Sequence, residues 1–291
     1  MILMVSGRCD IVAFYTKWFM NRYHEGYVDV RNPFYKKLVT RINFKDVDLF
    51  LFCTKNPLPI IPYLKEIKEP ILFHVTLTPY LSDIEPNVID KEKIIEGIKE
   101  VSKILGKENV YVRYDPILIN DKYTVSYHKK MFDRLCKKLN GYVDHIIISF
   151  VDDYKNVRHN MSTLKIKDLT NDDYKEIGTS FYKSAKENNM TVQTCFEENN
   201  LVEYGFIKNE CIGANLAYKL TGKVFKKWKA RKCNCVEITD IGVYNSCSHF
   251  CKYCYANYDE KKVKENMKKH NPNSSLLIGE LEKDDIIKEK N

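Results

Sequence analysis

Short runs of β-branched and aromatic residues alternate with longer amphipathic stretches along most of this chain. The short runs predict strands at Ile2–Ser6, Val47–Cys53, Ile71–Leu77, Val110–Tyr114, His145–Val151, Met190–Thr194 and Val236–Val243. The longer stretches predict helices at Ile11–Tyr23, Lys91–Leu105, Ser126–Leu139, Asp172–Asn188 and Cys211–Leu220. Several strand runs are almost wholly apolar, as in parallel strands that are buried on both faces. The alternation therefore predicts an α/β fold, a partial TIM-like (βα) barrel of about six or seven parallel strands.

Polar and charged residues follow most of the predicted strands. In such folds ligands bind at the carboxyl ends of the strands, so these residues predict one shared site. The candidates for its lining are Arg8, Asp10, Lys55, Arg113 and Asp115. Lys55 and Arg113 lie inside or beside apolar strands, where an unpaired cation is costly to bury, so each should meet a carboxylate or a bound anion. The alternative is that Pro, Asn and Asp residues here only form the turns that end strands.

Further acidic residues at strand ends are weaker candidates. Glu197, Asp152 and Asp153 could bind a ligand or serve as an acid or base, although most exposed Asp and Glu residues do neither.

The composition fits one large domain with a full-sized core. The 291 residues are 44% hydrophobic and 30% charged, with a formal net charge of +8. No apolar run reaches the roughly 18 residues of a membrane-spanning helix, and the first residues lack the basic region and cleavage site of a secretory signal. We therefore expect a cytoplasmic protein without a membrane partner.

Ten cysteines in a cytoplasmic protein indicate metal binding or redox chemistry rather than a disulfide framework. Cys247, Cys251 and Cys254 form a C-x3-C-x2-C motif. Three thiolates on one tight loop can bind three irons of a 4Fe–4S cluster and leave the fourth iron open. Zinc is the alternative, but structural zinc prefers four ligands, which neighbouring residues would have to complete.

A second set of cysteines lies before this motif: Cys195, Cys211, Cys233 and Cys235. Together they predict an auxiliary 4Fe–4S cluster or a zinc ion. The alternative is that Cys195 and Cys211 are ordinary buried thiols.

The motif C-x3-C-x-aromatic-C, with Tyr253 before its last cysteine, resembles the signature of radical S-adenosylmethionine enzymes. In that superfamily the open iron binds S-adenosylmethionine, and an electron from the cluster cleaves it to a 5′-deoxyadenosyl radical that abstracts hydrogen from a substrate. The resemblance implies a 4Fe–4S cluster on Cys247, Cys251 and Cys254, with Tyr253 near the adenine of S-adenosylmethionine. It also implies an electron donor such as flavodoxin or ferredoxin. The continuation Cys-Tyr-Ala-Asn at 254–257 is similar to the spore photoproduct lyase branch.

This resemblance gives the strand-end residues expected roles. We expect Lys55, Arg113 and Asp115 to be catalytic, and Arg8, Asp10 and Glu197 to help bind the cofactor. The function predicted is hydrogen abstraction from an unknown substrate. The alternative is a non-catalytic iron–sulfur or zinc protein that acts in electron transfer or nucleic-acid binding.

A wider set of motifs covers nearly the whole chain. They include Ser6-x-Arg8-x-Asp10, Arg31-Asn-Pro-Phe34, Thr54-Lys-Asn-Pro57, Arg113-Tyr-Asp-Pro116, Ser149-Phe-Val-Asp152 and Asp240-Ile-Gly-x-Tyr244. Together they resemble an uncharacterised family of domains of unknown function, DUF1848, known for a radical-enzyme-like cysteine cluster at its C-terminus. Cys9 departs from the threonine expected there and receives no role.

The position of the cysteine motif is unusual, because in most radical S-adenosylmethionine enzymes it follows the first strand. We therefore expect a circularly permuted barrel in which Val236–Val243 pairs with an early strand such as Ile2–Ser6 or Val47–Cys53. Residues 1–258 would form the barrel, with the cluster loop at 247–254. Residues 259–291 would form a charged tail in which 276–278 dock as an apolar clip and the last stretch is frayed.

A basic segment at 223–232 carries six cations interleaved with Phe225 and Trp228. Positive charge mixed with aromatic rings suits nucleic acid, which makes it one possible substrate class. The alternative is a solvated helix face with two core anchors.

Overall fold

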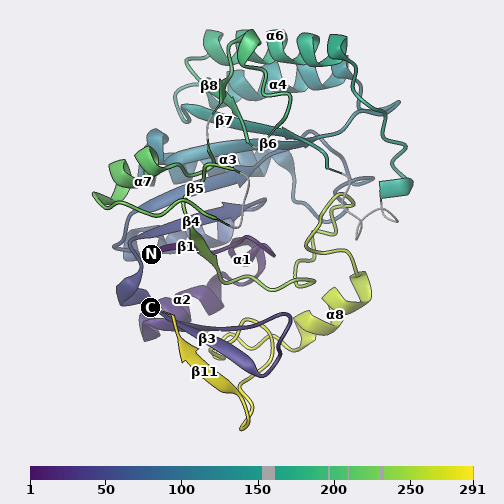
Figure 1. The fold of residues 1–291 in the computed structure, drawn as a ribbon. Helices are drawn as coiled ribbons and strands as arrows, with labels where there is room; N and C mark the ends of the chain where they lie inside the picture. Colours follow the sequence, from purple (N-terminus) through teal and green to yellow (C-terminus); the bar gives the residue numbers. More distant parts are fainter. Residues whose placement is uncertain (153–160, 196, 209, 230–232, 291) are drawn as a thin grey trace.

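One open sheet of parallel strands forms the centre of the fold (Figure 1). The computed structural model describes residues 1–152, 161–195, 197–208, 210–229 and 233–290. Within these residues the strand order is β10-β1-β4-β5-β6-β7-β8-β9, eight strands when the two-residue β9 is counted. The strands are β1 (Ile2–Met4), β4 (Leu49–Thr54), β5 (Ile71–Thr76), β6 (Val110–Ile117), β7 (His145–Phe150), β8 (Thr191–Thr194), β9 (Ile207–Lys208) and β10 (Ile238–Asp240). The predicted α/β fold with a parallel sheet is confirmed, and its curvature leaves the sheet unclosed.

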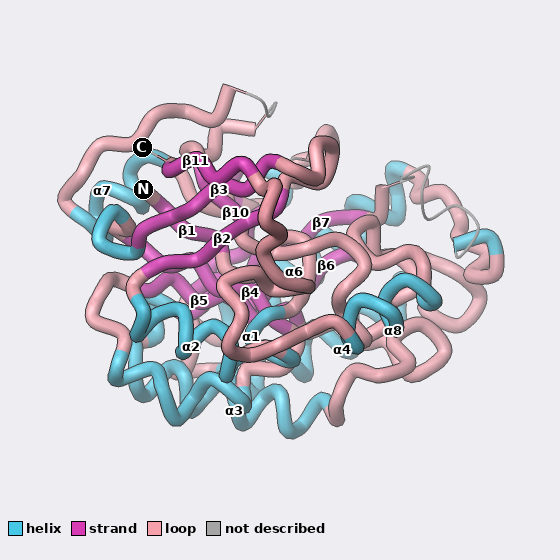
Figure 2. The backbone as a smooth tube through the Cα atoms, turned by 90° about the horizontal axis from the view of Figure 1, so that it is seen from below, coloured by secondary structure: helices cyan, strands magenta, loops and turns pink. Residues whose placement is uncertain are grey.

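Most helices cover one face of this sheet (Figure 2). They are α1 (Ile11–Phe14), α2 (Thr16–Glu25), α3 (Lys91–Leu105), α4 (Val125–Leu139) and α6 (Asn171–Glu187). Short 3₁₀ helices lie at Phe44–Asp46, Leu58–Glu66, Lys107–Asn109 and Val202–Tyr204. The N-cap side chains of Asp90, Thr124 and Thr170 begin α3, α4 and α6 by accepting from backbone N–H groups of the first turn.

The helix predicted at Ile11–Tyr23 is interrupted at Tyr15. This residue is both the C-cap of α1 and the N-cap of α2, with φ −134°. Its buried hydroxyl donates to the carbonyl of Ser246 at 2.5 Å, far along the chain. A tertiary contact therefore accompanies the break in a stretch whose local pattern favours one continuous helix.

The opposite face of the sheet is covered by α7 (Ala214–Thr221) and the segment that follows it. Ile2, Leu51, Tyr111 and Ile147 lie on this face together with Ala217. Because side chains alternate along a strand, positions 111, 113 and 115 of β6 share this face. Positions 51 and 53 of β4 and position 55, which directly follows β4, share it too. The sequence thus sends several of its polar strand-end residues to one side of the sheet.

The last strand of the sheet lies beside the first. In β10, Ile238 and Asp240 pair in parallel with Ile2 and Met4 of β1. Beyond the strands, the Arg8 Nε donates to the Asp240 carboxylate at 2.7 Å, and the backbone N–H of Gly7 donates to the same group. A side chain at Gly7 would bring a Cβ within 2.7 Å of this carboxylate. The predicted pairing of the late strand with Ile2–Ser6 is confirmed, although the strand is shorter than predicted.

The end of the chain is ordered against the rest of the protein. Helix α8 spans Glu260–Lys268, and β11 (Ile286–Glu289) pairs with β3 (Leu38–Asn43), which pairs with β2 (Tyr27–Arg31). Leu276 and Leu277 are buried, so the predicted apolar clip is confirmed. The expected fraying of the last stretch is wrong, because backbone hydrogen bonds from Ile286 and Lys290 tie it to β3 and its neighbour Lys37.

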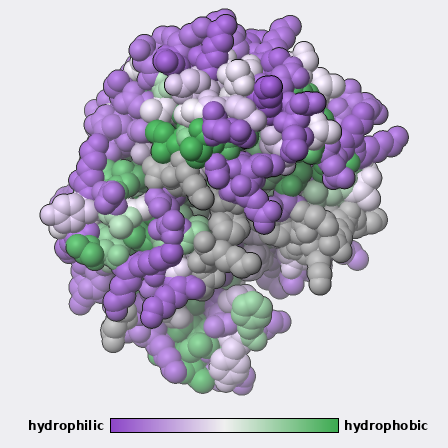
Figure 3. All heavy atoms as spheres, turned by 45° about the horizontal axis from the view of Figure 1, so that its top comes forward, coloured by the Kyte–Doolittle hydropathy of each residue, from purple (hydrophilic) through white to green (hydrophobic). Residues whose placement is uncertain are grey.

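The surface is mostly hydrophilic on the face drawn in Figure 3, where hydrophobic residues form small separate groups. Among the helices that the structure describes, none has the length and apolar character needed to cross a membrane.

Candidate functional site

The cysteine loop follows β10 and is held by side chains within and outside it. The Asn257 Oδ1 accepts from the backbone N–H groups of Ser246 and Cys247, both at 2.8 Å. The Asn257 amide also donates to the carbonyl of Arg8 at 3.2 Å. Asn245 and Phe250 adopt left-handed backbone conformations, with φ of 53° and 54°. These contacts fix the loop at the carboxyl end of β1.

Three thiols of the predicted cluster motif lie on this loop close enough to interact electrostatically. Cys247 and Cys251 are buried and Cys254 is half-buried. Burial raises the pKa of Cys247, and the neighbouring Asp10, Cys251 and Cys254 raise it further. Burial also raises the pKa of Cys251. Thiolates so placed repel one another, so only a positive centre between them would make all three stable as anions.

These thiols match a thiophilic metal centre in donor type and spacing. They are not arranged around a metal position: in the described part of the chain no three His, Cys, Asp or Glu side chains converge in that way. A cluster would therefore require the cysteine side chains to turn toward a common point.

A buried carboxylate, Glu85, joins the cysteine loop to the sheet. Its Oε1 accepts from the Lys55 Nζ at 2.7 Å and from the Thr78 hydroxyl at 2.6 Å. The Tyr253 hydroxyl donates to the same oxygen, and Lys91 pairs with the other one. Tyr253, between the last two motif cysteines, therefore meets Lys55 through a shared acid, with the Lys55 Nζ 5.6 Å from its ring centre.

The charges of this group stabilise one another. Burial alone would raise the pKa of Glu85, but Lys55 and Lys91 lower it to about 2. Burial would lower the pKa of Lys55, but Glu85 and Cys251 raise it. Burial lowers the pKa of Lys91, which Glu85 only partly opposes. The group therefore places two lysines around one carboxylate, leaving an excess of positive charge beside Cys251.

Asp10 connects the cysteine loop to β4. Its Oδ2 accepts from the backbone N–H of Lys55 at 2.8 Å and lies 3.0 Å from the Nε2 of His249. Its Oδ1 caps α1 through the N–H of Ala13. His249 is a buried loop residue, and its ring position ties the loop to this carboxylate.

Arg113 and Asp115 form a second ion pair on the same face of the sheet. The Arg113 Nε donates to the Asp115 Oδ2 at 3.0 Å, and the Ser149 hydroxyl lies 3.4 Å from that oxygen. Burial would lower the pKa of Arg113, but Asp115 and Cys53 raise it. The prediction that Lys55 and Arg113 each meet a carboxylate is confirmed.

Glu197 lies near this pair after β8. Its Oε1 accepts from the backbone N–H of Phe150 at 2.9 Å. Burial raises the pKa of Glu197, and the nearby Asp152 and Asp115 raise it further. The hydrogen bond from Phe150 lowers it, and the result is a pKa of about 7. Glu197 can therefore gain or lose a proton near neutral pH. Asp153 lies outside the described residues.

Arg8, which the sequence predicts to help bind a cofactor, pairs with Asp240. Its guanidinium donates to both the carboxylate and the carbonyl of Asp240, at 2.7 and 2.8 Å. It therefore joins β1 to β10, a role that the strand-end pattern did not indicate because its partner lies on the last strand.

The second set of cysteines contains one disulfide, although the sequence predicts metal binding or redox chemistry rather than a disulfide framework. Cys195 and Cys211 are bonded to each other, whereas Cys233 and Cys235 are free. The bond forms because the ends of β8 and β9 bring two residues that are 16 positions apart within 6.2 Å between their Cα atoms.

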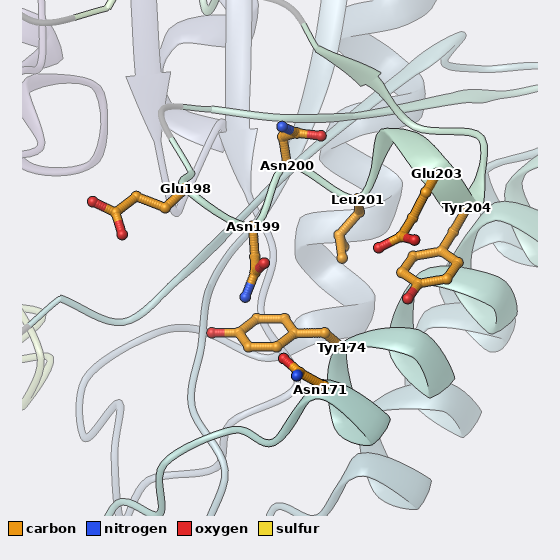
Figure 4. Close-up of a pocket in the computed structure, with 8 residues that line it drawn as sticks. All are labelled: Asn171, Tyr174, Glu198, Asn199, Asn200, Leu201, Glu203 and Tyr204. Carbon is orange, nitrogen blue, oxygen red and sulfur yellow. The ribbon is translucent and has the colours of Figure 1, made fainter.

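A surface hollow of about 450 Å³ lies beside the Glu197 segment rather than at the cysteine loop (Figure 4). Asn171 and Tyr174 of α6 face Asn199 and Leu201 across it. None of these residues is a candidate predicted from the sequence, and neither a motif cysteine nor Lys55 lines the hollow.

Glu85 and Lys91 are not among the residues predicted from the sequence. Thr78 belongs to the polar end of β5, one of the strand ends that predict a shared site, but it was not predicted to contact Lys55. Glu85 lies in the following loop, where nothing in the local sequence distinguishes it from exposed acids. The requirement that Lys55 find a carboxylate predicts a partner but not its identity.

The described part of the basic segment, residues 223–229, contains no helix. Lys227 pairs with Val236 in an isolated antiparallel bridge, and 230–232 lie outside the described residues. Phe225 packs against the α7 side of the sheet. The predicted solvated helix face is therefore wrong, and its lysines at 223, 226, 227 and 229 are exposed.

No curated protein matches the chain. The family model described as "Domain of unknown function (DUF1848)" matches residues 2–256, which include every strand of the large sheet and the cysteine loop. The chain belongs to the DUF1848 family.

Proposed function

We propose that this chain is a radical S-adenosylmethionine enzyme in which Cys247, Cys251 and Cys254 hold a 4Fe–4S cluster. The observation that carries the proposal is the placement of these three coupled thiols at the carboxyl edge of a parallel sheet, joined to Lys55 through Tyr253 and Glu85. This edge is where α/β folds bind their ligands. When bound, the cluster would supply the electron that cleaves S-adenosylmethionine to a 5′-deoxyadenosyl radical.

The residues around the thiols suit an anionic centre. A cluster with three thiolates carries negative charge, and Lys55 lowers the pKa of Cys251 against the effect of burial. Lys55 and Lys91 share Glu85 as their counterion, so one carboxylate is matched by two cations. The remaining positive charge favours thiolates at the loop. Tyr253 has its hydroxyl fixed on Glu85, which holds its ring near the thiols.

Arg113, Asp115 and Glu197 are proposed to act on the substrate. They lie on the face of the sheet that also presents Lys55, away from most helices. The buried Arg113 can orient an anionic group, and its pairing with Asp115 fixes its plane. Glu197, with a pKa of about 7, can hold or release a proton as the substrate reacts. The reaction also requires a one-electron donor of the flavodoxin or ferredoxin type.

Anaerobic reconstitution with iron and sulfide tests the proposal. The wild-type chain should bind about four irons at the loop, show an EPR signal after reduction that changes when S-adenosylmethionine is added, and release 5′-deoxyadenosine. Cys251→Ala should abolish all three results. Cys136→Ala is the matched control, because Cys136 is equally buried but lies in α4, and it should behave as the wild type.

Two results would contradict the proposal. One is tetrahedral zinc on the motif cysteines with no cleavage of S-adenosylmethionine, which favours the non-catalytic metal protein. The other is 5′-deoxyadenosine formation that persists in Cys251→Ala at the wild-type rate.

A further inference from the structure

Four cysteines outside the cluster loop meet on the α7 side of the sheet. Cys195 follows β8, and its backbone N–H donates to the carbonyl of Ile148 at 3.2 Å. Cys211 lies between β9 and α7, and Cys233 and Cys235 lie on the segment that leads to β10. Three separate segments therefore contribute a sulfur to this region.

The two pairs lie on segments that contact each other. Cys195 and Cys211 are joined by a disulfide. Burial raises the pKa of the Cys235 thiol, and the Cys233 side chain and the backbone of Ile212 and Cys211 are close enough to affect that pKa as well. The N–H of Val236 donates to the carbonyl of Ile212 at 3.0 Å, which aligns the two segments. The free pair thus lies directly against the bonded pair.

A cation and a surface hollow lie near these cysteines. The Arg113 Nη1 lies 3.4 Å from the Cys211 sulfur. A hollow of about 460 Å³ is lined by Glu210, Gly213, Asn234 and Val236 among others. Glu210 is adjacent to Cys211 in the sequence, and Asn234 lies between Cys233 and Cys235, so the hollow borders the segments that carry three of the four cysteines.

The spacing favours one metal ion over a cluster. A tetrahedral zinc site holds four sulfurs at about 2.3 Å from the ion, so its sulfurs are close neighbours of one another. A 4Fe–4S cube separates its thiolates more widely. Here the sulfurs of Cys195 and Cys211 are already in direct contact, and Cys233 and Cys235 are only two positions apart in the chain. Four thiolates around a dication leave a charge of about −2, which Arg113 partly offsets.

While the disulfide is intact, only Cys233 and Cys235 are available as donors. In keeping with this, no three metal-binding side chains converge anywhere in the described residues. Opening the bond would double the number of thiols at the site.

We propose that reduction of the Cys195–Cys211 bond creates a four-thiolate site for a single Zn²⁺ ion, completed by Cys233 and Cys235. A dithiol reductant gives two electrons and two protons to the disulfide and becomes a disulfide itself. Zn²⁺ then replaces the protons of the two new thiols and of Cys233 and Cys235, and these protons pass to the solvent. The site does not depend on the proposed radical chemistry, because none of its ligands belongs to the cluster loop.

Zinc binding by the full chain in its two redox states tests this inference. The Cys251→Ala variant is used so that the loop cannot supply three thiolates. Disulfide-intact protein should bind no zinc at this site. After reduction with a phosphine, which removes the disulfide without chelating zinc, the protein should gain two reactive thiols and bind one zinc ion per chain. Reoxidation with diamide should release the ion.

Ligand variants identify the site. Cys233→Ser should weaken zinc binding by more than about 100-fold, because losing a ligand costs more than the 10–100-fold loss seen on changing an outer partner. Cys136→Ser, a buried cysteine elsewhere, should leave it unchanged. Cobalt in place of zinc should give the visible absorption of a tetrahedral thiolate complex, and serine at 233 should alter it.

Three results would overturn the inference: equal zinc binding before and after reduction, zinc binding unaffected by Cys233→Ser, or uptake of about four irons with sulfide at these cysteines. The comparison of redox states uses one folded chain, so a variant that fails to fold does not decide the outcome. S-adenosylmethionine cleavage plays no part in the measurement, so failure of the proposed function is distinguishable from failure of this site.

Discussion

The hydroxyl of Tyr253 donates to the carboxylate of Glu85, and this contact joins the cysteine loop to the loop that follows β5. Both residues are buried, and Lys55 and Lys91 approach the same carboxylate from two sides. Tyr253 therefore belongs to a charged network with Glu85 and the two lysines. Separate substitutions of Tyr253 and Glu85 test the contributions of the hydroxyl and of the carboxylate.

Replacing Glu85 with glutamine should destabilise the protein strongly. It leaves Lys55 and Lys91 without their buried counterion, which typically costs about 3–5 kcal/mol. The pKa of Glu85 is lowered from 4.5 to about 2, so the folded state binds fewer protons than the unfolded state between these values. Its contribution is complete above pH 4.5 and is lost as the pH falls toward 2.

Urea unfolding at pH 7 and at acidic pH measures both effects of Glu85→Gln. The variant should show a smaller loss of stability in acid than the wild type. Glu92→Gln is the control, since Glu92 is half exposed where it pairs with Arg134 and Lys138, and it should change stability by less than about 1 kcal/mol. Equal effects of the two substitutions would argue against a special role for Glu85.

Removing only the hydroxyl of Tyr253 should have a smaller effect. Tyr253→Phe keeps the ring and loses a hydrogen bond to a charged group, worth about 1.5–3 kcal/mol. Tyr255→Phe is the matched control, because its more exposed hydroxyl donates to a neutral carbonyl, that of Gly7, at 3.0 Å. Chemical denaturation should show that Tyr253→Phe is clearly less stable than Tyr255→Phe. The reverse order would contradict a stabilising role for the hydrogen bond between Tyr253 and Glu85.

The pairing of Arg8 with Asp240 should contribute to the attachment of β10. A double-mutant cycle with Arg8→Met and Asp240→Asn should give a coupling energy of about 0.5–3 kcal/mol. The exposed pair Lys103 and Glu100 should give less than about 1 kcal/mol in the same experiment. A coupling near zero for Arg8 and Asp240 would mean that backbone pairing alone holds the strand.

Glu197 should make stability depend on pH near neutrality. Its pKa is raised from 4.5 to about 7, so the folded state binds more protons than the unfolded state in this range. The contribution of Glu197 to the free energy of unfolding is therefore most favourable below pH 4.5. The protein becomes less stable as the pH rises through 7. Glu197→Gln should flatten this decline between pH 5 and 8 in urea titrations.

The exposed residue Glu203 provides the comparison for Glu197. Glu203→Gln should leave the pH profile of unfolding as in the wild type. If Glu197→Gln also leaves it unchanged, the carboxyl group titrates at its ordinary value and cannot serve as the proposed acid or base.

The large sheet could be predicted because its strands are buried on both faces. Leu49–Thr54 and His145–Phe150 are nearly continuous apolar runs, which no exposed segment tolerates. The small sheet could not. All four residues of β11 are exposed, and backbone hydrogen bonds to β3 and its neighbours hold the strand without an apolar face that the sequence would reveal.

The candidate site could be predicted only in part, because the sequence shows which residues need partners but not where the partners lie. The cost of burying a cation indicated that Lys55 and Arg113 meet carboxylates. For Arg113 the partner is two residues away in the same strand, whereas for Lys55 it is 30 residues away in a loop. Arg8 finds its partner 232 residues later. Only the fold brings such pairs together.

The position of β10 beside β1 has a consequence for how the protein is made. Gly7 and Asp240 are 233 residues apart, so during synthesis the start of the chain must wait for its neighbour. Until then β1 is an open edge, to which other chains can add a strand. Pairing at such long range is also slow to form. The cysteine loop is therefore synthesised after all the strands of the large sheet. Any metal binding at the loop would be one of the last steps in the maturation of this protein.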